Sequence, residues 1–540
     1  MIKEIIRGMD VIRALALLKV IVLCFSVLSE ASSLQFPEQI HISYGSSHDS
    51  MVVMWSSRGE VKWEVHYGTS RTLIQMMADS TVATLPDTHF KAAKYIYRSE
   101  LKNLTPATIY FYKIVSRSNR NPETESSVFS FKTLPEDNEH DAISRFVVYG
   151  DMGARMSDPT RAAIETFRKN TNVDAILHVG DFAYDLDSDG GQIGDIFMNE
   201  IQSFAAEIPY MTAPGNHEIP QNFEPYRIRF STPNTSWPIP LDKMWYSFDV
   251  GLVHFISYST EVYFANNEEH VCGQFQWLLQ DLIAANKNRD KRPWIIAMGH
   301  RPMYCSNNDG DDCTDAFMRR WVKTGLEPLF NAQGVDLVIE AHEHSYERLY
   351  PMYNGEVERF NYTNPRAPVH IISGSAGSLE GIDGWSESPR KWSAFRSSRK
   401  DFQSFGVLEI HNRTHLYFSQ HDAKDNTTVD QFWMIQDTHE PFVKNVKCFG
   451  SFIHESCFCH LPLVMLRTVI ILFSLLFVPF IVGIVICVIR IIKCRSRRKH
   501  RRQSVCSSNC SRLECSSTSS GSSVSDCESE LLLEEDDTSR

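Results

Sequence analysis

Five short polar motifs, each at the end of an apolar segment, constrain the fold of this chain more than any other feature. In chain order they are Gly150-Asp151-Met152-Gly153, Gly180-Asp181-Phe182-Ala183-Tyr184, Gly215-Asn216-His217-Glu218, Gly299-His300-Arg301-Pro302 and Glu340-Ala341-His342-Glu343-His344. Four of them directly follow apolar runs typical of buried strands, at 145–149, 175–179, 294–298 and 335–339, and a further run spans 252–256. Segments of helical character at 160–170 and 274–285 alternate with these runs, which predicts a layered α/β domain. Because ligands bind beyond the carboxyl ends of strands in such sheets, we expect the five motifs to converge.

The residue types in these motifs indicate a metal centre. Asp and Asn offer oxygen and His offers an imidazole nitrogen, a mixed set that suits iron, zinc or manganese better than calcium. Tyr184 adds a phenol, which as phenolate favours a strongly Lewis-acidic ion such as ferric iron. Each motif alone has a structural explanation, since Gly-Asp is usually a turn and His-x-His is usually part of a polar loop. Five in this order favour a functional site.

A separate β-rich domain precedes this region. Strand-like runs lie at 39–44, 51–55, 63–67 and 110–115, separated by Gly and Ser. Leu104-Thr105-Pro106 followed by Tyr110 resembles the tyrosine corner of fibronectin type III domains. We therefore expect a fibronectin-III-like β-sandwich over residues 34–135 and the catalytic domain over 143–437.

Two apolar segments predict the membrane topology. Residues 1–33 have the layout of a signal peptide, with Lys and Arg before an apolar core and small residues after it, although a retained N-terminal anchor is the alternative. Residues 468–489 carry no charge and are long enough to cross a bilayer as a helix. Eight Lys and Arg residues follow between 490 and 502 and predict a cytoplasmic tail, residues 490–540, which we expect to be disordered. The catalytic domain of this single-pass type I protein would be extracellular or luminal, at the plasma membrane, endosome or lysosome.

Glycosylation signals and cysteines agree with an oxidising compartment. The Asn-x-Ser/Thr triplets begin at Asn103, Asn234, Asn361, Asn412 and Asn426, all on the predicted outer side. Six cysteines lie between the predicted signal peptide and the apolar span, and Cys305 with Cys313 is the favoured disulfide. In the Cys-containing juxtamembrane segment, 438–467, disulfides compete with a zinc site at Cys457, Cys459 and His460.

The ordered set GDMG, GDFAY, GNHE, GHRP and AHEH resembles the five metallophosphoesterase blocks of the purple acid phosphatases, and Tyr184 distinguishes that family from other metallophosphoesterases. The resemblance covers residues 36–437 and looks closest to the long form found in animals. It implies a metallophosphoesterase β-sandwich with flanking helices. It also implies metal ligands: Asp151, Tyr184 and His344 for Fe(III), Asp181 as the bridge, and Asn216, His300 and His342 for a second divalent ion, Fe, Zn or Mn.

The function implied by the resemblance is hydrolysis of small phosphate monoesters in acid. The metal pair would generate the attacking hydroxide, and His217 would contact the phosphate and protonate the leaving group. A phosphodiesterase on the same centre, and a non-catalytic membrane receptor or adhesion protein that retains the fold, are the alternatives. Plant members place histidines in the loop after the GHxP-type block, whereas residues 306–313 here are acidic and should disfavour highly anionic substrates.

The remaining expectations concern partners. A net charge of −12 argues against nucleic-acid binding, which needs a basic face. Glu528 followed by Leu532 and Leu533 fits an acidic dileucine signal for sorting adaptors, and a solvated acidic terminus is the alternative.

His178 and His254, on two of the expected strands, are interpreted as core or supporting residues rather than ligands.

Overall fold

The computed structural model describes residues 36–87, 92–117, 125–136, 143–265, 268–308, 325–399 and 402–443. The predicted signal peptide, the span at 468–489, the tail, most of the juxtamembrane segment and Cys313 lie outside these ranges. No helix within them is long and apolar enough to cross a membrane.

The N-terminal domain consists of two antiparallel four-stranded sheets. One contains β1 (Glu38–Tyr44), β2 (Met51–Ser57), β6 (Ala92–Leu101) and β5 (Thr81–Asp87), in that order, and the other contains β4 (Met76–Asp79), β3 (Trp63–Gly68), β7 (Ile109–Ser116) and β8 (Phe129–Lys132). The hydroxyl of Tyr110 accepts a hydrogen bond of 3.0 Å from the backbone N–H of Thr105, the contact expected of a tyrosine corner.

Two larger sheets form the catalytic domain. The six-stranded sheet has the order β13 (Tyr210–Ala213), β11 (Ala175–Val179), β9 (Ser144–Tyr149), β23 (Ser404–Ile410), β24 (His415–Asp422), β25 (Thr428–Ile435). The seven-stranded sheet has the order β14 (Tyr246–Val250), β15 (Val253–Ser257), β16 (Trp294–Met298), β17 (Leu337–Glu340), β21 (Val369–Ser373), β18 (Tyr346–Leu349), β22 (Ser393–Arg396). Two short ladders, β10 (Met152–Gly153) with β12 (Phe182–Ala183) and β19 (Met352–Tyr353) with β20 (Glu356–Val357), complete it.

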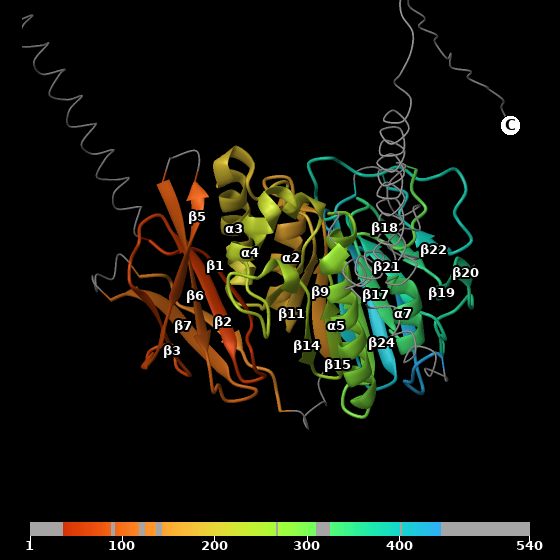
Figure 1. Cartoon of the computed structure of the whole chain (residues 1–540), viewed down its shortest axis with the longest axis horizontal. Coiled ribbons are helices and arrows are strands. Elements are labelled where there is room, and N and C mark those ends of the chain that lie inside the picture. The colour runs from red at the N-terminus through yellow and green to blue at the C-terminus, as the bar shows by residue number, and fades with distance from the viewer. Residues whose placement is uncertain are drawn as a thin grey trace, which may run out of the picture. The chain divides into compact units, whose positions relative to one another are not determined.

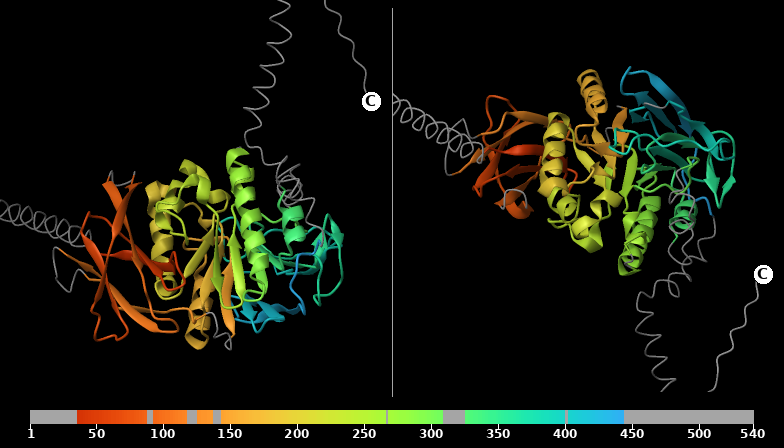
Figure 2. Two further views of the ribbon diagram at one scale, coloured as in Figure 1. Left: turned by 60° about the horizontal axis from the view of Figure 1, so that its bottom comes forward. Right: turned by 90° about the horizontal axis from the view of Figure 1, so that it is seen from above.

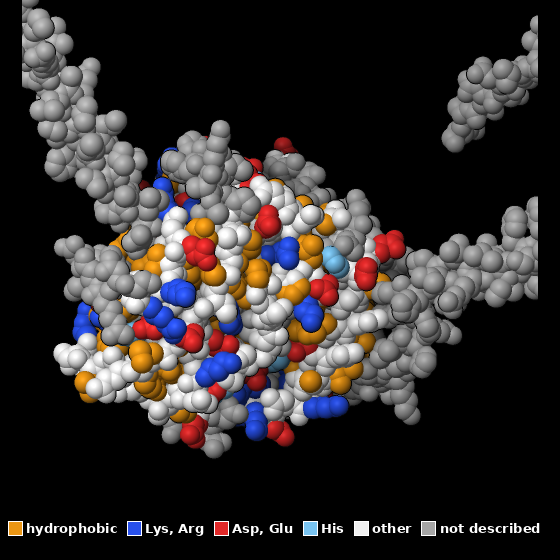
Figure 3. Space-filling view, turned by 60° about the vertical axis from the view of Figure 1, so that its left-hand side comes forward, with side chains coloured by type: hydrophobic (Ala, Val, Ile, Leu, Met, Phe, Trp, Pro, Cys, Tyr) orange, Lys and Arg blue, Asp and Glu red, His pale blue; other side chains and the backbone are white. Residues whose placement is uncertain are grey.

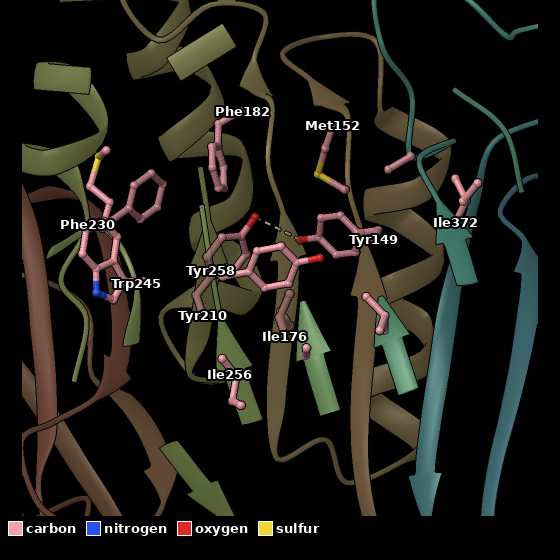
Figure 4. Packing of buried hydrophobic residues seen from close by; sticks show 14 of the residues in the cluster. Tyr149, Met152, Ile176, Phe182, Tyr210, Phe230, Trp245, Ile256, Tyr258 and Ile372 are labelled. Atoms are coloured by element: carbon pink, nitrogen blue, oxygen red, sulfur yellow. Dashed lines mark hydrogen bonds between the residues drawn. The ribbon is translucent and has the colours of Figure 1, made fainter. Parts of the chain in front are cut away.

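Strand alternation decides which side chains lie between the sheets and which meet the helices. In β9, Phe146 and Val148 belong to the cluster between the sheets, where Phe146 meets Phe255 edge-on at 4.7 Å. Val147 and Tyr149 belong to the cluster on the other face, where Tyr149 donates a hydrogen bond to Tyr210 (Figure 4). The α-helices among the described residues are α2 (Asp158–Asn170), α3 (Gln192–Ala205), α4 (Glu224–Arg229), α5 (Glu268–Lys287) and α7 (Leu326–Gln333). The predicted β-sandwich with flanking helices is confirmed for the described residues.

The N-terminal sandwich packs on the catalytic domain beside α3 and α4 (Figures 1 and 2). The backbone N–H groups of Gln39 and Ile40 in β1 donate hydrogen bonds to side chains of α3, at 3.2 Å and 2.8 Å. Acidic and basic side chains are interspersed over the face drawn in Figure 3.

Candidate metal centre

The predicted ligands all follow the carboxyl end of a strand. Asp151 follows β9, Asp181 follows β11, Tyr184 follows β12, Asn216 follows β13, His300 follows β16, and His342 and His344 follow β17. In the six-stranded sheet β13, β11 and β9 are parallel, and in the seven-stranded sheet β15, β16, β17 and β21 are parallel. The strand ends therefore meet at one edge of the double sheet, and the structure brings all seven side chains into two adjoining groups.

The first group, called the Tyr184 group, consists of Asp151, Tyr184 and His344. The Tyr184 hydroxyl oxygen lies 3.2 Å from Asp151 Oδ1 and 2.7 Å from His344 Nε2, and these last two atoms are 3.6 Å apart. All three residues are buried. One carboxylate, one phenol and one imidazole thus point at a common space of the size that a single ion requires.

The second group, called the His300 group, consists of Asp181, Asn216, His300 and His342. His300 Nε2 lies 3.1 Å from Asp181 Oδ2 and 3.0 Å from Asn216 Oδ1. Donor atoms of Asp181, His300 and His342 all lie within 4.8 Å of one another, as metal ligands do. His300 Nδ1 is 2.9 Å from the carbonyl oxygen of Val179, which orients the ring so that Nε2 faces the group.

The backbone at the centre adopts conformations that most residues avoid. Asp151, Asp181, Tyr184 and His342 have φ values of 60°, 56°, 54° and 70°, in the left-handed region. Such conformations cost about 1 kcal/mol or more each and persist where the surrounding structure enforces them. Gly180, at φ 85°, has no room for a Cβ, because that atom would overlap the His300 ring.

Glu218 binds the backbone of two loops that form the centre. Its carboxylate, which is 3% exposed, accepts hydrogen bonds from the backbone N–H groups of Asp181 (3.0 Å), Phe182 (3.0 Å) and Gly215 (2.8 Å). Burial, followed by the charge of Asp181, raises the pKa of Glu218. One side chain therefore ties the loops that carry Asp181 and Asn216 together.

His217 lies beside the Tyr184 group. Its ring centroid is 4.4 Å from that of Tyr184, its Nδ1 is hydrogen-bonded to Asp185, and its Nε2 is 3.9 Å from Asp181 Oδ2. Glu380 Oε1 is 3.7 Å from the same Nε2. Burial alone would lower the pKa of His217, but Asp181 and Asp185 outweigh it and raise that pKa. The acids around His217 therefore favour its protonated form.

The carboxylates make the centre favour positive charge. Burial disfavours the charged form of His300 and of His344, yet Asp181 raises the pKa of His300 to about 10 and Asp151 raises that of His344 to about 9. Burial, then Asp151 and Asp181, raises the pKa of Tyr184 well above its ordinary value, so a phenolate there requires a strong cation. The donor set, its burial and its excess of acidic groups fit bound metal ions.

The structure also places residues that the sequence left open. His178 is buried in the core, with Nδ1 2.6 Å from the Tyr210 hydroxyl, and His254 lies between Asp249 and Asp281, so neither belongs to the centre. Four residues that contact the centre were given no role in the sequence analysis, namely Glu218, Asp185, Arg301 and Glu380. The sequence offered one signal for Glu218, Asp185 and Arg301, which is that each lies next to or within a predicted motif.

The other predicted sites are partly described. All five sequon asparagines have exposed side chains, namely Asn103, Asn234, Asn361, Asn412 and Asn426. Cys272 and Cys305 are both disulfide-bonded. Because Cys313 lies outside the described ranges, its pairing with Cys305 stays a prediction.

Models of known families match three parts of the chain. The purple acid phosphatase N-terminal domain matches residues 37–133, the calcineurin-like phosphoesterase model matches 144–346, and the iron/zinc purple acid phosphatase-like C-terminal model matches 367–431. The three matched segments correspond, in this order, to the N-terminal sandwich, to most of the catalytic domain and to the C-terminal strands of that domain.

Similar proteins and one solved structure agree with these matches. The chain is 42% identical to acid phosphatase type 7 of Danio rerio over 431 residues, covering 75% of this chain and 92% of that protein. It is 43% identical to the Homo sapiens protein of the same name over 419 residues, covering 74% and 91%. The structure of a purple acid phosphatase from yellow lupin (Lupinus luteus) seeds has the same fold, with a TM-score of 0.65, 22% identity and 76% of each chain covered. The chain belongs to the purple acid phosphatase family of metal-dependent phosphatases.

Proposed function

We propose that this chain hydrolyses phosphate monoesters in acid at a dinuclear Fe(III)–M(II) centre, where M is iron, zinc or manganese. As a family member it is a metal-dependent acid phosphatase, and membership implies a dinuclear metal centre. The observation that carries the finer proposal is the division of seven donors, five buried and two partly buried, into two groups that adjoin at Asp181.

In this proposal the Tyr184 group would hold the ferric ion, because a phenol with a raised pKa becomes a ligand only beside a strong Lewis acid. Asn216, His300 and His342 would hold the divalent ion, and Asp181 could contribute to both sites. Bound ions would acidify a water molecule, orient the phosphate and neutralise its charge. Glu218 keeps the Asp181 and Gly215 loops at a constant separation through its three backbone contacts.

His217 acts as the general acid. Asp185 occupies Nδ1, so Nε2 is the nitrogen that can deliver a proton to the leaving-group oxygen. The raised pKa of His217 keeps the ring protonated in acid, which is the state that proton donation requires.

The test uses purified full-length protein and Tyr184→Phe. We expect about two metal ions per chain, hydrolysis of p-nitrophenyl phosphate at acid pH, and a visible tyrosinate-to-iron absorption band that Tyr184→Phe abolishes. Bis-p-nitrophenyl phosphate is measured in parallel. Faster turnover of this diester than of the monoester would show that the protein is a phosphodiesterase. Protein that binds no metal and hydrolyses neither ester would favour a non-catalytic receptor or adhesion protein.

We also propose that the catalytic domain lies outside the cytosol on a single-pass type I protein, anchored by residues 468–489. The exposed side chains of the five sequon asparagines support this location, since each is accessible to glycosylation. Treatment of cell-made protein with an N-glycosidase should lower its apparent mass, and protein without glycans would contradict the location. Recognition of the dileucine signal by sorting adaptors remains part of this proposal.

A further inference from the structure

Arg301 follows the predicted ligand His300 directly, and it contacts the second ligand of the same group. Its Nη1 lies 3.1 Å from His342 Nε2, and its backbone N–H donates a hydrogen bond of 3.1 Å to Thr260 Oγ1. The side chain is 10% exposed. A guanidinium therefore stands at the edge of the His300 group, mostly shielded from water.

Among the described residues, Glu261 and Phe264 hold this guanidinium in place. Its Nε donates to both carboxylate oxygens of Glu261, at 3.1 Å and 3.0 Å, and Glu261 is fully buried. Its Cζ lies 4.3 Å from the centre of the Phe264 ring, within the range of a cation–π contact. Glu261 is in turn hydrogen-bonded by the Thr260 hydroxyl at 2.8 Å. Glu261 therefore binds the Nε atom of Arg301, and the Nη1 atom of the guanidinium faces the predicted ligand His342.

Such an arrangement suits recognition of phosphate. A planar guanidinium donates N–H groups to phosphate oxygens in fixed directions, and a donor held in place before binding loses little entropy on contact. His217 lies against Tyr184, whereas Arg301 contacts His342, so the two side chains serve different groups of the centre.

We propose that Arg301 binds a non-bridging oxygen of the substrate phosphate and is a specificity-determining residue for phosphate esters. This inference rests on the proposed function, because it requires the phosphate to occupy the space beside the His300 group. Glu261 and Phe264 orient the guanidinium, and Arg301 supplies affinity for the phosphate while His217 supplies the proton.

The test compares metal-loaded, full-length wild type with Arg301→Gln and Arg301→Lys. Binding of inorganic phosphate is measured by calorimetry, metal content by elemental analysis, and KM and kcat with p-nitrophenyl phosphate. We expect Arg301→Gln to weaken phosphate binding about 10- to 100-fold and to raise KM in parallel, with metal content retained, since one charge-assisted hydrogen bond is lost. Arg301→Lys should recover part of the affinity, because it keeps the charge but not the fork.

The matched control is Arg348→Lys. Arg348 is also held by an acid through Nε, at 2.7 Å from Asp430, and lies 5.1 Å and 5.0 Å from the rings of Tyr362 and Phe432, which are not residues of the centre. Unchanged phosphate affinity in Arg301→Gln, or a loss of metal with normal affinity in the loaded fraction, would overturn the role of Arg301. If Arg301→Gln does not fold, Arg301→Lys decides by the same measurement. A metal-loaded wild type that neither binds phosphate nor hydrolyses esters would instead refute the proposed function.

Discussion

At the scale of single residues, the contact between Asp185 and His217 decides which nitrogen of the His217 ring faces the centre. Asp185 hydrogen-bonds Nδ1, and after Asp181 it is a cause of the raised pKa of His217. The second motif contains Asp181 and Tyr184 and predicted both as ligands, whereas the role of Asp185 depends on its contact with His217 in the folded protein.

Replacing Asp185 by Asn should impair the proton donor without removing it. We expect kcat for an alkyl ester such as glycerol phosphate to fall about tenfold, and less for p-nitrophenyl phosphate, whose leaving group needs little protonation. Because the variant lowers the pKa of His217, the alkaline limb of the kcat profile should move to lower pH. Asp290→Asn, an exposed change, is the control. Equal losses for both esters with an unmoved limb would show a purely structural role.

At the scale of elements, α5 contains a glycine that the packing does not require. A Cβ on Gly273 would lie 3.7 Å and 3.9 Å from ring atoms of Trp245, which is ordinary contact. Gly273→Ala should therefore raise the free energy of unfolding by about 0.5–1 kcal/mol, as expected within a helix, with a higher Tm in thermal unfolding. Gly215→Ala is the contrasting variant, because its Cβ would overlap the Asp181 carboxylate and should abolish activity. A lower Tm in Gly273→Ala would contradict this packing.

The same helix is joined to the seven-stranded sheet by His254. Its Nδ1 lies 2.7 Å from Asp249 Oδ1 in β14 and its Nε2 lies 2.9 Å from Asp281 Oδ2 in α5. Burial lowers the pKa of His254, but the hydrogen bonds to Asp249 and Asp281 prevail and raise it from 6.5 to about 9. Because folding raises this pKa, protonated His254 stabilises the fold fully at pH values below its pKa in the unfolded chain. This contribution disappears as the pH rises through its pKa in the folded protein.

His254→Gln should accordingly lose stability only at lower pH. We expect the free energy of unfolding in urea to fall by up to about 3 kcal/mol at pH 6, and the difference from wild type to close near pH 10. His411→Gln is the comparison, because the His411 ring contacts a single acid, Glu409 of β23, at 3.2 Å. A loss that is independent of pH would mean that His254 contributes packing rather than charge.

At the scale of the whole molecule, the sandwich and the catalytic domain share a buried ion cluster. Asp195 in α3 pairs with Lys94 of β6 and accepts a hydrogen bond of 2.9 Å from Arg229 of α4. The side chains of Lys94 and Arg229 are 3% and 1% exposed. Removing the acid would leave two buried cations without this partner.

Asp195→Asn should therefore destabilise the whole protein by about 3–5 kcal/mol, measured by denaturant unfolding. Asp158, whose side chain is 75% exposed, forms a salt bridge with Arg161, so Asp158→Asn should cost less than about 1 kcal/mol. Similar, small losses in both variants would refute the importance of the cluster for joining the two domains.

The sequence by itself determined the strand-and-motif pattern, the tyrosine corner and the seven donors, because ligand chemistry and a strand followed by a tight turn are local properties of the chain. The start of α5 at Glu268 and the late strands β23 to β25 were not predicted. β23 pairs with β9, although most of the sequence of the catalytic domain separates the two strands. Pairing between such distant segments leaves little trace in the residue pattern of either strand.

The tertiary structure produces the division of the donors that the resemblance implied, and it alone decided what surrounds them. The Tyr184 and His300 groups arise because parallel strands from two sheets end at one edge, and Glu218, Asp185 and Arg301 acquire roles only through contacts with residues far along the chain. His178 and His254 have comparable positions on strands, yet one is enclosed in the core and the other bridges two acids. The sequence specifies the seven donor side chains, whose chemistry belongs to the residues themselves. The geometry and the charge around these side chains depend on packing between distant segments.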